Sequence, residues 1–228
     1  MDDKERELEH YRKLCTFMFG ISLDLLRHYF EIKILDKKEL FYFLDLYKHV
    51  LFHALYPAVS CCECRNGSSP LSKKPRTLYP DQFSLLFDIE DSTLQCLHNK
   101  TGQQKCLCKY SASRSVKIDS LDISLVSAIV NTCCPSIHGN PQWIKDIKDT
   151  RNFLLHKGDF RLKKDEYDTR LNTVEMATLH LAEVVSSTSL KMIQKQISDF
   201  KKDVPSFDTV TDILASSNDD VCKVRLLN

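Results

Sequence analysis

The chain has 228 residues, with 32 basic and 31 acidic side chains, so its formal net charge is only +1. This balance excludes a basic field over the whole surface, and any binding of nucleic acid has to come from a local patch. The chain also has only 5 glycines, which favours helices over a β-sandwich, a barrel or a glycine-rich phosphate loop. We therefore expect an all-α protein.

No segment has the pattern of a secretory signal or of a membrane-spanning helix. Residues 1–13 are rich in charge, and the apolar run at 40–55 is interrupted by Asp45, Lys48 and His49. We therefore predict a cytoplasmic protein that does not enter a membrane. In a reducing compartment its 10 cysteines more often serve as thiols or metal ligands than as disulfides.

Two helices are predicted in the first segment, residues 1–56. Apolar residues recur at helical spacing from about Asp3 to about Ile34, and again from about Lys37 to Tyr56. Gly20 interrupts the first run and indicates a kink or break, because glycine costs roughly 1 kcal/mol in a helix interior. Pro57 ends the second helix.

The second segment, residues 57–119, is predicted to be an irregular cysteine-rich insertion, because Gly, Pro and Ser clusters punctuate short apolar pieces. It contains two Cys-x-Cys pairs, and Cys61, Cys96 and His98 lie near them. The four paired cysteines are Cys62, Cys64, Cys106 and Cys108. Structural zinc sites usually space paired ligands by two to four residues, so thiols are favoured here, and zinc binding by these four cysteines stays an open alternative.

His49 and His53 are four residues apart on the second predicted helix and could present two imidazoles to a metal. No glutamate or third ligand completes a hydrolytic motif there. We interpret them as histidines on the helix surface or at the edge of the core, and we predict no metal ligand in the chain.

The third segment, residues 120–200, returns to helical periodicity. A short apolar helix starts near Asp119 and is stopped by Pro135, and another helix runs from about Trp143 to His156. The longest predicted helix covers about Lys163 to Asp199, and its second half is expected to pack on a partner. The tail, residues 201–228, is expected to be peripheral.

The most informative pattern is Arg151-Asn152-x-x-x-His156 on the helix that ends at His156. On a helical wheel Arg151 falls inside the apolar arc, whereas Asn152 and His156 stack on an adjacent polar flank. An arginine on an inward face needs an acceptor or a wet cleft, because burying its charge unpaired is expensive. A structural pair between Arg151 and a carboxylate, with His156 at the helix end, is the simpler interpretation.

The segment from Leu121 to about Leu181 resembles the HEPN superfamily (higher eukaryotes and prokaryotes nucleotide-binding). The resemblance rests on the apolar helix opened by Leu121-Asp122-Ile123-Ser124-Leu125, the Pro/Gly loop, the run from Asp146 to His156, and the long helix that follows. Within the superfamily, the chain is most similar to the type of HEPN domain in the DAZ-interacting zinc-finger ubiquitin ligase. Over residues 10–57 only helix lengths and the helix end look alike, and the insertion is not matched.

The resemblance implies an up-and-down bundle of four or five helices that forms a homodimer and needs no cofactor. Many members are metal-independent endoribonucleases. By analogy Arg151 would bind the scissile phosphate, His156 would handle the proton of the ribose 2′-hydroxyl or of the leaving group, and Asn152 would orient either group. The product would carry a 2′,3′-cyclic phosphate.

Lys148 and Lys157 would add local attraction for single-stranded RNA, although an ordinary solvated helix face explains them as well. No DNA binding is expected. Other HEPN domains are non-catalytic modules for dimerisation or protein interaction, here in innate immune or ubiquitin signalling. The two hypotheses differ in Arg151, which an RNA site needs accessible and near His156, and which an interaction module would hold in a salt bridge.

Overall fold

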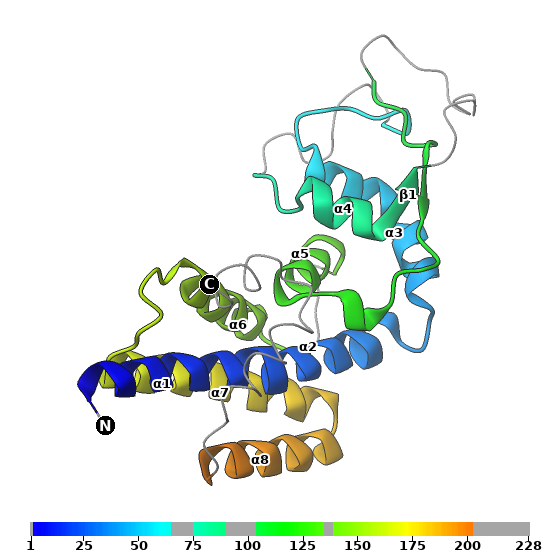
Figure 1. Cartoon of the computed structure of the whole chain (residues 1–228). Helices are drawn as coiled ribbons and strands as arrows, with labels where there is room; N and C mark the ends of the chain where they lie inside the picture. Colours follow the sequence, from blue (N-terminus) through cyan, green and yellow to red (C-terminus); the bar gives the residue numbers. More distant parts are fainter. Residues whose placement is uncertain (1, 65–74, 90–103, 135–138, 203–228) are drawn as a thin grey trace. The chain divides into compact units, whose positions relative to one another are not determined.

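The computed structural model describes residues 2–64, 75–89, 104–134 and 139–202. The described chain is mostly helical, with one short two-stranded sheet (Figure 1). This agrees with the all-α prediction. In the described part of the chain, no helix has the length and apolar character that crossing a membrane requires.

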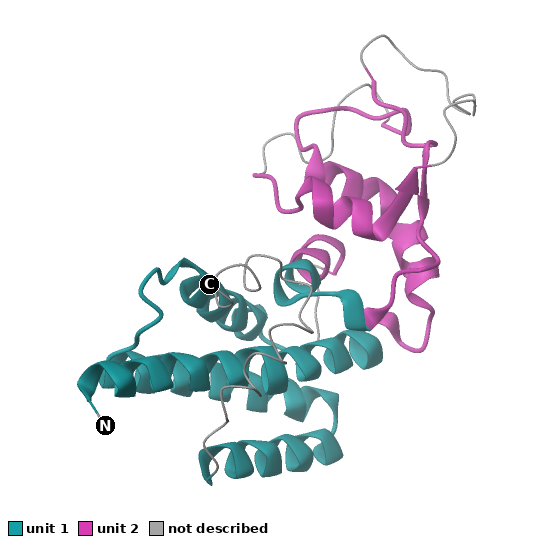
Figure 2. Cartoon of the chain, in the orientation of Figure 1, with its two compact units in different colours: residues 1–34, 119–127, 136–228 teal, residues 35–118, 128–135 magenta. Residues whose placement is uncertain are grey.

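The chain divides into two compact units (Figure 2). Unit 1 contains residues 1–34, 119–127 and 136–228, and unit 2 contains residues 35–118 and 128–135. The second predicted helix therefore groups with the cysteine-rich segment, not with the first helix. The predicted tail from residue 203 onward lies outside the described residues, as do Cys96 and His98.

Unit 1 opens with one long helical run that contains two π-helical turns. Helix α1 (Asp3–Thr16) passes through a π-helical turn (Phe17–Ser22) into α2 (Leu23–Tyr29), and a second π-helical turn follows (Phe30–Leu35). Gly20, where a kink or break was expected, lies inside the first π-helical turn. Local π turns are a known way for a long helix to bend without ending.

Three further helices lie entirely within unit 1: α6 (Pro141–His156), α7 (Lys164–Val185) and α8 (Ser187–Lys202). The Asn140 side chain caps α6 by accepting a hydrogen bond from the Gln142 N–H at 2.9 Å. Helix α7 is the central element, since it packs against α1, α2, α6 and α8. Its buried stripe, which matches the predicted apolar periodicity, includes Val174, Leu181 and Val185.

The prediction of one helix from about Lys163 to Asp199 is wrong. The chain breaks at Ser186, whose backbone is extended at φ −172° and ψ 161°. The Ser186 hydroxyl accepts a hydrogen bond from the Ser189 N–H at 3.0 Å, as an N-cap does for a new helix. Helix α8 then folds back on α7, and Lys201 forms an ion pair with Glu175 at 2.7 Å. The half expected to pack on a partner therefore packs within its own chain.

Unit 2 contains α3 (Leu40–Leu55), α4 (Pro80–Leu86) and the antiparallel strands β1 (Phe87–Ile89) and β2 (Tyr110–Ala112). Aromatic rings join these elements: Phe83 stacks on Phe87 at 4.6 Å and meets Tyr110 edge to face at 5.2 Å between centroids. The segment predicted to be irregular thus contributes a helix, a short sheet and buried aromatic residues.

A short 3₁₀ turn (Ile118–Ser120) leads to α5 (Ile123–Cys133), and the boundary between the two units falls inside this helix. Asp122 caps α5, because its carboxylate accepts the Leu125 N–H at 2.6 Å. Arg27 on α2 anchors the approach to α5 by donating hydrogen bonds to the carbonyls of Asp119 and Leu121.

Candidate functional site

Arg151 lies in the middle of α6 with its guanidinium between an amide and a carboxylate. It donates a hydrogen bond to Asn152 Oδ1 at 3.1 Å, and its other terminal nitrogen lies 3.5 Å from Asp122 Oδ2. Only 14 % of the Arg151 side chain is exposed. The inward arginine therefore has the acceptor that its position in the apolar arc requires.

Asp122 connects two elements of this site, although the sequence pattern did not single it out as the partner of Arg151. One of its oxygens caps the first turn of α5, and the other faces Arg151 on α6. Its side chain is 20 % exposed. At 3.5 Å the ion pair is longer than the 2.7–2.9 Å usual for charge-assisted hydrogen bonds, so Asp122 orients the guanidinium without holding it in a tight contact.

His156 is the last residue of α6 and is exposed. Five residues separate it from Arg151, which corresponds to about 140° around the helix axis. Asn152 lies one turn before His156 on the same side, as predicted from the four-residue spacing. The structure thus joins Asn152 to Arg151 directly. It places His156 at the exposed end of the same helix, on a different side of the helix from Arg151.

The end of α6 is held in place by Tyr11 on α1. The Tyr11 hydroxyl donates a hydrogen bond to the Leu154 carbonyl at 3.2 Å, which satisfies one of the acceptors that a helix leaves at its C-terminus. The Lys157 N–H donates to the same carbonyl at 3.2 Å. His156 is therefore carried on a fixed helix end.

The two lysines predicted to attract RNA differ in their surroundings. Lys157 forms an ion pair with Glu166 at 2.9 Å, and its ammonium lies 5.4 Å from the centre of the Phe153 ring. Arg170 lies over the same ring at 4.3 Å. Lys148 is half-buried on α6. Lys157 is thus already partly neutralised by its own unit.

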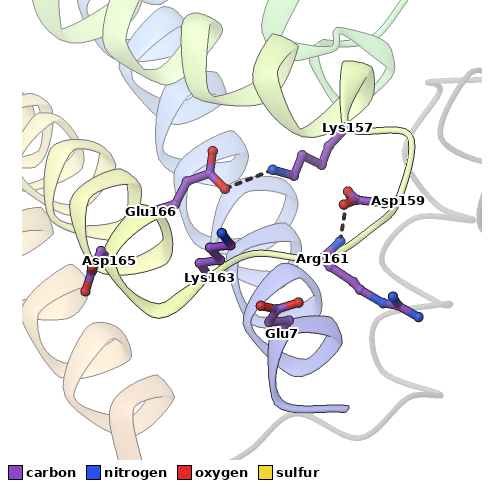
Figure 3. Close-up of a pocket in the computed structure, with 7 residues that line it drawn as sticks. All are labelled: Glu7, Lys157, Asp159, Arg161, Lys163, Asp165 and Glu166. Atoms are coloured by element: carbon purple, nitrogen blue, oxygen red, sulfur yellow. Dashed lines mark hydrogen bonds and ion pairs between the residues drawn. The ribbon is translucent and has the colours of Figure 1, made fainter. Parts of the chain in front are cut away.

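A polar pocket of about 410 Å³ adjoins the end of α6 (Figure 3). Its lining carries four acidic and three basic side chains: Glu7, Asp159, Asp165, Glu166, Lys157, Arg161 and Lys163. Because the acids outnumber the bases, the pocket does not favour a phosphate over a neutral polar ligand. The charge of its lining therefore gives no preference for an RNA backbone.

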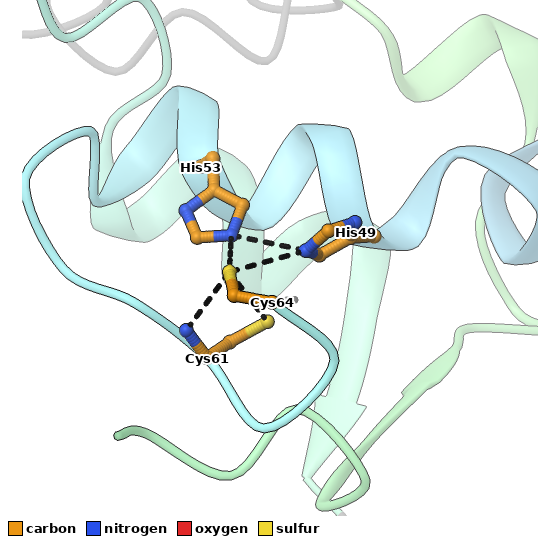
Figure 4. A group of neighbouring side chains, drawn as sticks. All are labelled: His49, His53, Cys61 and Cys64. Carbon is orange, nitrogen blue, oxygen red and sulfur yellow. Dashed lines mark hydrogen bonds between the residues drawn. The ribbon is translucent and has the colours of Figure 1, made fainter. Parts of the chain in front are cut away.

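Unit 2 contains two clusters of metal-binding side chains. One consists of His49, His53, Cys61 and Cys64 (Figure 4). The other consists of Cys62, Cys106 and Cys108. None of the eight cysteines in the described ranges is part of a disulfide. The first Cys-x-Cys pair is therefore split, because Cys62 and Cys64 belong to different clusters, whereas Cys106 and Cys108 of the second pair lie in the same cluster.

The two histidines do not lie on an open helix surface, which was one of the two positions expected for them. His53 is fully buried, and burial lowers the pKa of its imidazole and favours the neutral ring. Its Nε2 atom lies 3.2 Å from His49 Nε2 and 3.1 Å from the Cys64 sulfur. This cluster is the most strongly organised group of polar side chains in unit 2.

In comparisons with known proteins, no family model, curated protein or solved structure matches this chain. The HEPN resemblance consequently stays a prediction made from the residues of the chain. The function proposed next depends on the geometry of α5 and α6.

Proposed function

We propose that this chain is an HEPN-type domain that binds single-stranded RNA at the exposed end of α6 and acts as a homodimer in the cytoplasm. The observation that carries the proposal is the orientation of Arg151 by Asn152 and Asp122, at 3.1 and 3.5 Å, on the helix that ends in exposed His156. A guanidinium with a fixed direction is well suited to a phosphate, because it offers parallel N–H donors.

The same groups define the reaction that bound RNA would undergo. Arg151 would stabilise the charge that develops on the scissile phosphate, and His156 would take the proton of the neighbouring 2′-hydroxyl. The hydroxyl oxygen then attacks phosphorus, the bond from phosphorus to the 5′-oxygen breaks, and the 5′-oxygen takes a proton from solvent water, which leaves a 2′,3′-cyclic phosphate. This sequence of steps needs no metal ion and no cofactor. A homodimer would supply a second Arg151 and His156 to the same strand.

The proposal is tested with labelled single-stranded RNA in buffer without added divalent cations. Binding is measured by fluorescence anisotropy, and cleavage is measured by separating the products on a gel. We expect the wild-type chain to bind, and Arg151→Ala and His156→Ala to reduce binding or cleavage at least tenfold. Arg151→Lys separates charge from geometry, because lysine keeps the charge but loses the paired donors.

His28→Ala is the matched control for the histidine, since the His28 side chain is 40 % exposed on α2 of the same unit. This variant should behave as wild type. Equal binding and cleavage by the wild type, Arg151→Ala and His156→Ala would exclude the motif as the RNA site. Circular dichroism of each variant shows whether the fold is retained.

A second candidate function is a non-catalytic module for protein interaction, and two observations favour it. Arg151 forms an ion pair with Asp122 and only 14 % of its side chain is exposed, which is the arrangement expected of an interaction module. Helix α3 exposes two large apolar side chains one turn apart, Tyr42 at 62 % and Leu46 at 71 %. Such a pair on one helix face is typical of a surface that packs on a partner. Tyr42→Glu combined with Leu46→Glu should abolish self-association in analytical ultracentrifugation if this face forms the dimer. Unchanged self-association would remove the face from consideration.

A further inference from the structure

The cluster of His49, His53, Cys61 and Cys64 is assembled by two neighbouring segments of unit 2. The histidines are one turn apart on α3, so both rings project from the same side of the helix. The cysteines follow in the loop after the helix ends, three residues apart. Figure 4 shows the loop turning back so that both sulfur atoms face the two rings.

Four of the six distances between the donor atoms are close to those of a tetrahedral zinc site, and all six are within 4.8 Å. Bonds of about 2.3 Å to sulfur and about 2.05 Å to nitrogen set edges of about 3.8 Å between sulfurs, about 3.6 Å between sulfur and nitrogen, and about 3.3 Å between nitrogens. The sulfurs of Cys61 and Cys64 lie 3.7 Å apart. Cys64 lies 3.5 and 3.1 Å from the two Nε2 atoms, which lie 3.2 Å from each other.

A disulfide does not explain this arrangement. The Cys61 and Cys64 sulfurs are 3.7 Å apart, whereas a disulfide bond is about 2.05 Å long. A nucleophilic Cys-His pair is excluded by access, because Cys61 and His53 have no exposed surface and Cys64 has only 9 %. The sealed position fits a structural site, in which all ligands come from the protein.

Two hydrogen bonds to the backbone orient ligands of this cluster. His53 Nδ1 lies 3.4 Å from the Tyr56 carbonyl, so the ring hydrogen is held there and the Nε2 lone pair points into the cluster. The Cys61 N–H donates to the Cys64 sulfur at 3.3 Å. The lone pairs of donors from both segments thus converge on one point.

We propose that His49, His53, Cys61 and Cys64 bind one structural zinc ion that joins the end of α3 to the loop after it. The two spacings are those of known zinc ligands, His-x₃-His and Cys-x₂-Cys. Two thiolates and two neutral imidazoles select zinc over hard cations such as Mg²⁺ and Ca²⁺, which prefer oxygen ligands. The proposal is independent of the RNA site in unit 1.

The neighbouring thiols of Cys62, Cys106 and Cys108 are not part of this site. Cys62 and Cys108 lie 3.7 Å apart, and the Leu107 N–H donates to the Cys62 sulfur at 3.2 Å. Three thiols fall one ligand short of the four that a structural zinc site uses. Any zinc bound by these three thiols would add to the zinc measured per chain. The experiment therefore compares the zinc content of each variant with that of the wild type.

The test measures zinc per chain by mass spectrometry of the intact holoprotein, purified without a polyhistidine tag and without chelators. We expect at least one zinc per wild-type chain. His53→Ala and Cys64→Ser should each lose one equivalent relative to the wild type. Cys134→Ser, a cysteine of unit 2 outside both clusters, should keep the wild-type content. Wild-type protein that neither contains zinc nor binds added Zn²⁺ would overturn the proposal, as would stoichiometric iron in its place.

A second variant keeps the test decisive if the alanine variant does not fold. His53→Cys preserves four ligands, so it should retain the zinc that His53→Ala loses. Replacing zinc by Co²⁺ should give the visible absorption of a tetrahedral ion, with stronger sulfur-to-metal charge transfer in His53→Cys than in the wild type. An octahedral Co²⁺ spectrum, or the same spectrum in both proteins, would contradict ligation by His53.

Discussion

At the residue scale, the candidate RNA site depends on a single carboxylate. Asp122 caps α5 through the Leu125 N–H at 2.6 Å and faces Arg151 at 3.5 Å. The two tasks fall on different atoms of one side chain, since a carboxylate has two oxygens. They can therefore be separated by substitution.

Asp122→Ala should reduce the free energy of unfolding by about 1–3 kcal/mol, because it removes both the cap and the partner of a half-buried arginine. Asp122→Asn keeps a capping oxygen and removes the charge, so it should cost only about 0–1 kcal/mol. Urea unfolding followed by circular dichroism measures both. An equal loss in the two variants would show that the ion pair, and not the cap, stabilises the start of α5.

Asp122→Asn, which should cost little stability, should strengthen the proposed RNA binding. Asp122→Asn removes the negative charge that competes with phosphate for Arg151, so the affinity for single-stranded RNA should rise severalfold at low salt. Fluorescence anisotropy at two salt concentrations checks this. Asp122→Asn keeps an acceptor oxygen that can orient Arg151, so weaker binding than by the wild type would contradict this expectation and show that the orientation requires the negative charge.

The raised pKa of Tyr167 on α7 should make the folded chain less stable at alkaline pH. Burial, together with Asp168, Glu9 and Glu175, raises its pKa to about 12 from 10.0. Between these two values the unfolded chain loses the phenolic proton and the folded chain keeps it, so stability falls as pH rises from 10 to about 12. The free energy of unfolding, measured at several pH values across this range, should fall less steeply with pH in Tyr167→Phe than in the wild type. Identical curves would assign the alkaline loss to other groups.

At the element scale, helix boundaries are set by polar side chains and by one backbone conformation that requires glycine. Ser186 ends the run of α7 and starts α8 through its hydroxyl. Before α6, Gly139 has a φ of +102°, and a Cβ there would lie 2.7 Å from the Trp143 ring. The Trp143 ring in turn stacks on His180 of α7 at 4.8 Å. The entry to the helix that carries Arg151 is therefore tightly packed.

Gly139→Ala should lower the free energy of unfolding by about 1–3 kcal/mol, because the left-handed backbone and the close ring both oppose a methyl group. Gly158→Ala is the matched control just after α6, where nothing lies within 4 Å of an added Cβ. It should change stability by less than about 0.5 kcal/mol. Similar losses in both variants would indicate that the Trp143 contact is not what constrains residue 139.

At the scale of the whole molecule, the chain consists of two units that are stabilised differently. Unit 1 buries the periodic apolar faces of α1, α2, α6, α7 and α8. Unit 2 has a smaller set of elements and contains both clusters of metal-binding side chains. Small folds with little core often depend on a structural metal.

Removal of zinc should therefore affect the two units unequally. Hydrogen exchange followed by mass spectrometry, with and without a chelator, should show faster exchange in residues 40–64 and 104–112 and unchanged exchange in α6, α7 and α8. Readdition of Zn²⁺ should restore the slow exchange. No change in unit 2 on treatment with the chelator, or equal changes in both units, would contradict a structural ion in unit 2 alone.

Much of the secondary structure was predictable from apolar periodicity. The helices expected at about Lys37 to Tyr56 and Trp143 to His156 are α3 and α6, with ends moved by a few residues. The break at Ser186 was missed because the apolar stripe continues through it, and only the hydroxyl cap reveals a new start. The helix and sheet of the segment 57–119 were missed because its short elements carry too few residues to show a period.

The candidate sites were likewise predictable only in part from the sequence. The inward position of Arg151 predicted that its guanidinium has an acceptor. That acceptor, Asp122, is 29 residues away in sequence, so only the packing of α5 against α6 identifies it. The zinc-type spacings His49-x₃-His53 and Cys61-x₂-Cys64 are both legible in the sequence. The histidine spacing was recognised but was left without a third ligand, and Cys61-x₂-Cys64 was overlooked because Cys62-x-Cys64 offered a competing pairing of Cys64.

The sequence by itself determined the helical character of the chain, the apolar faces of α3, α6 and α7, and the presence of an arginine that must be paired, because periodicity and charge are local properties. The tertiary structure decided which side chains meet: Arg151 with Asp122, Cys61 and Cys64 with the two histidines, and Cys62 with Cys108. Such contacts depend on the direction in which loops turn, and that direction is set by the packing of the elements they connect.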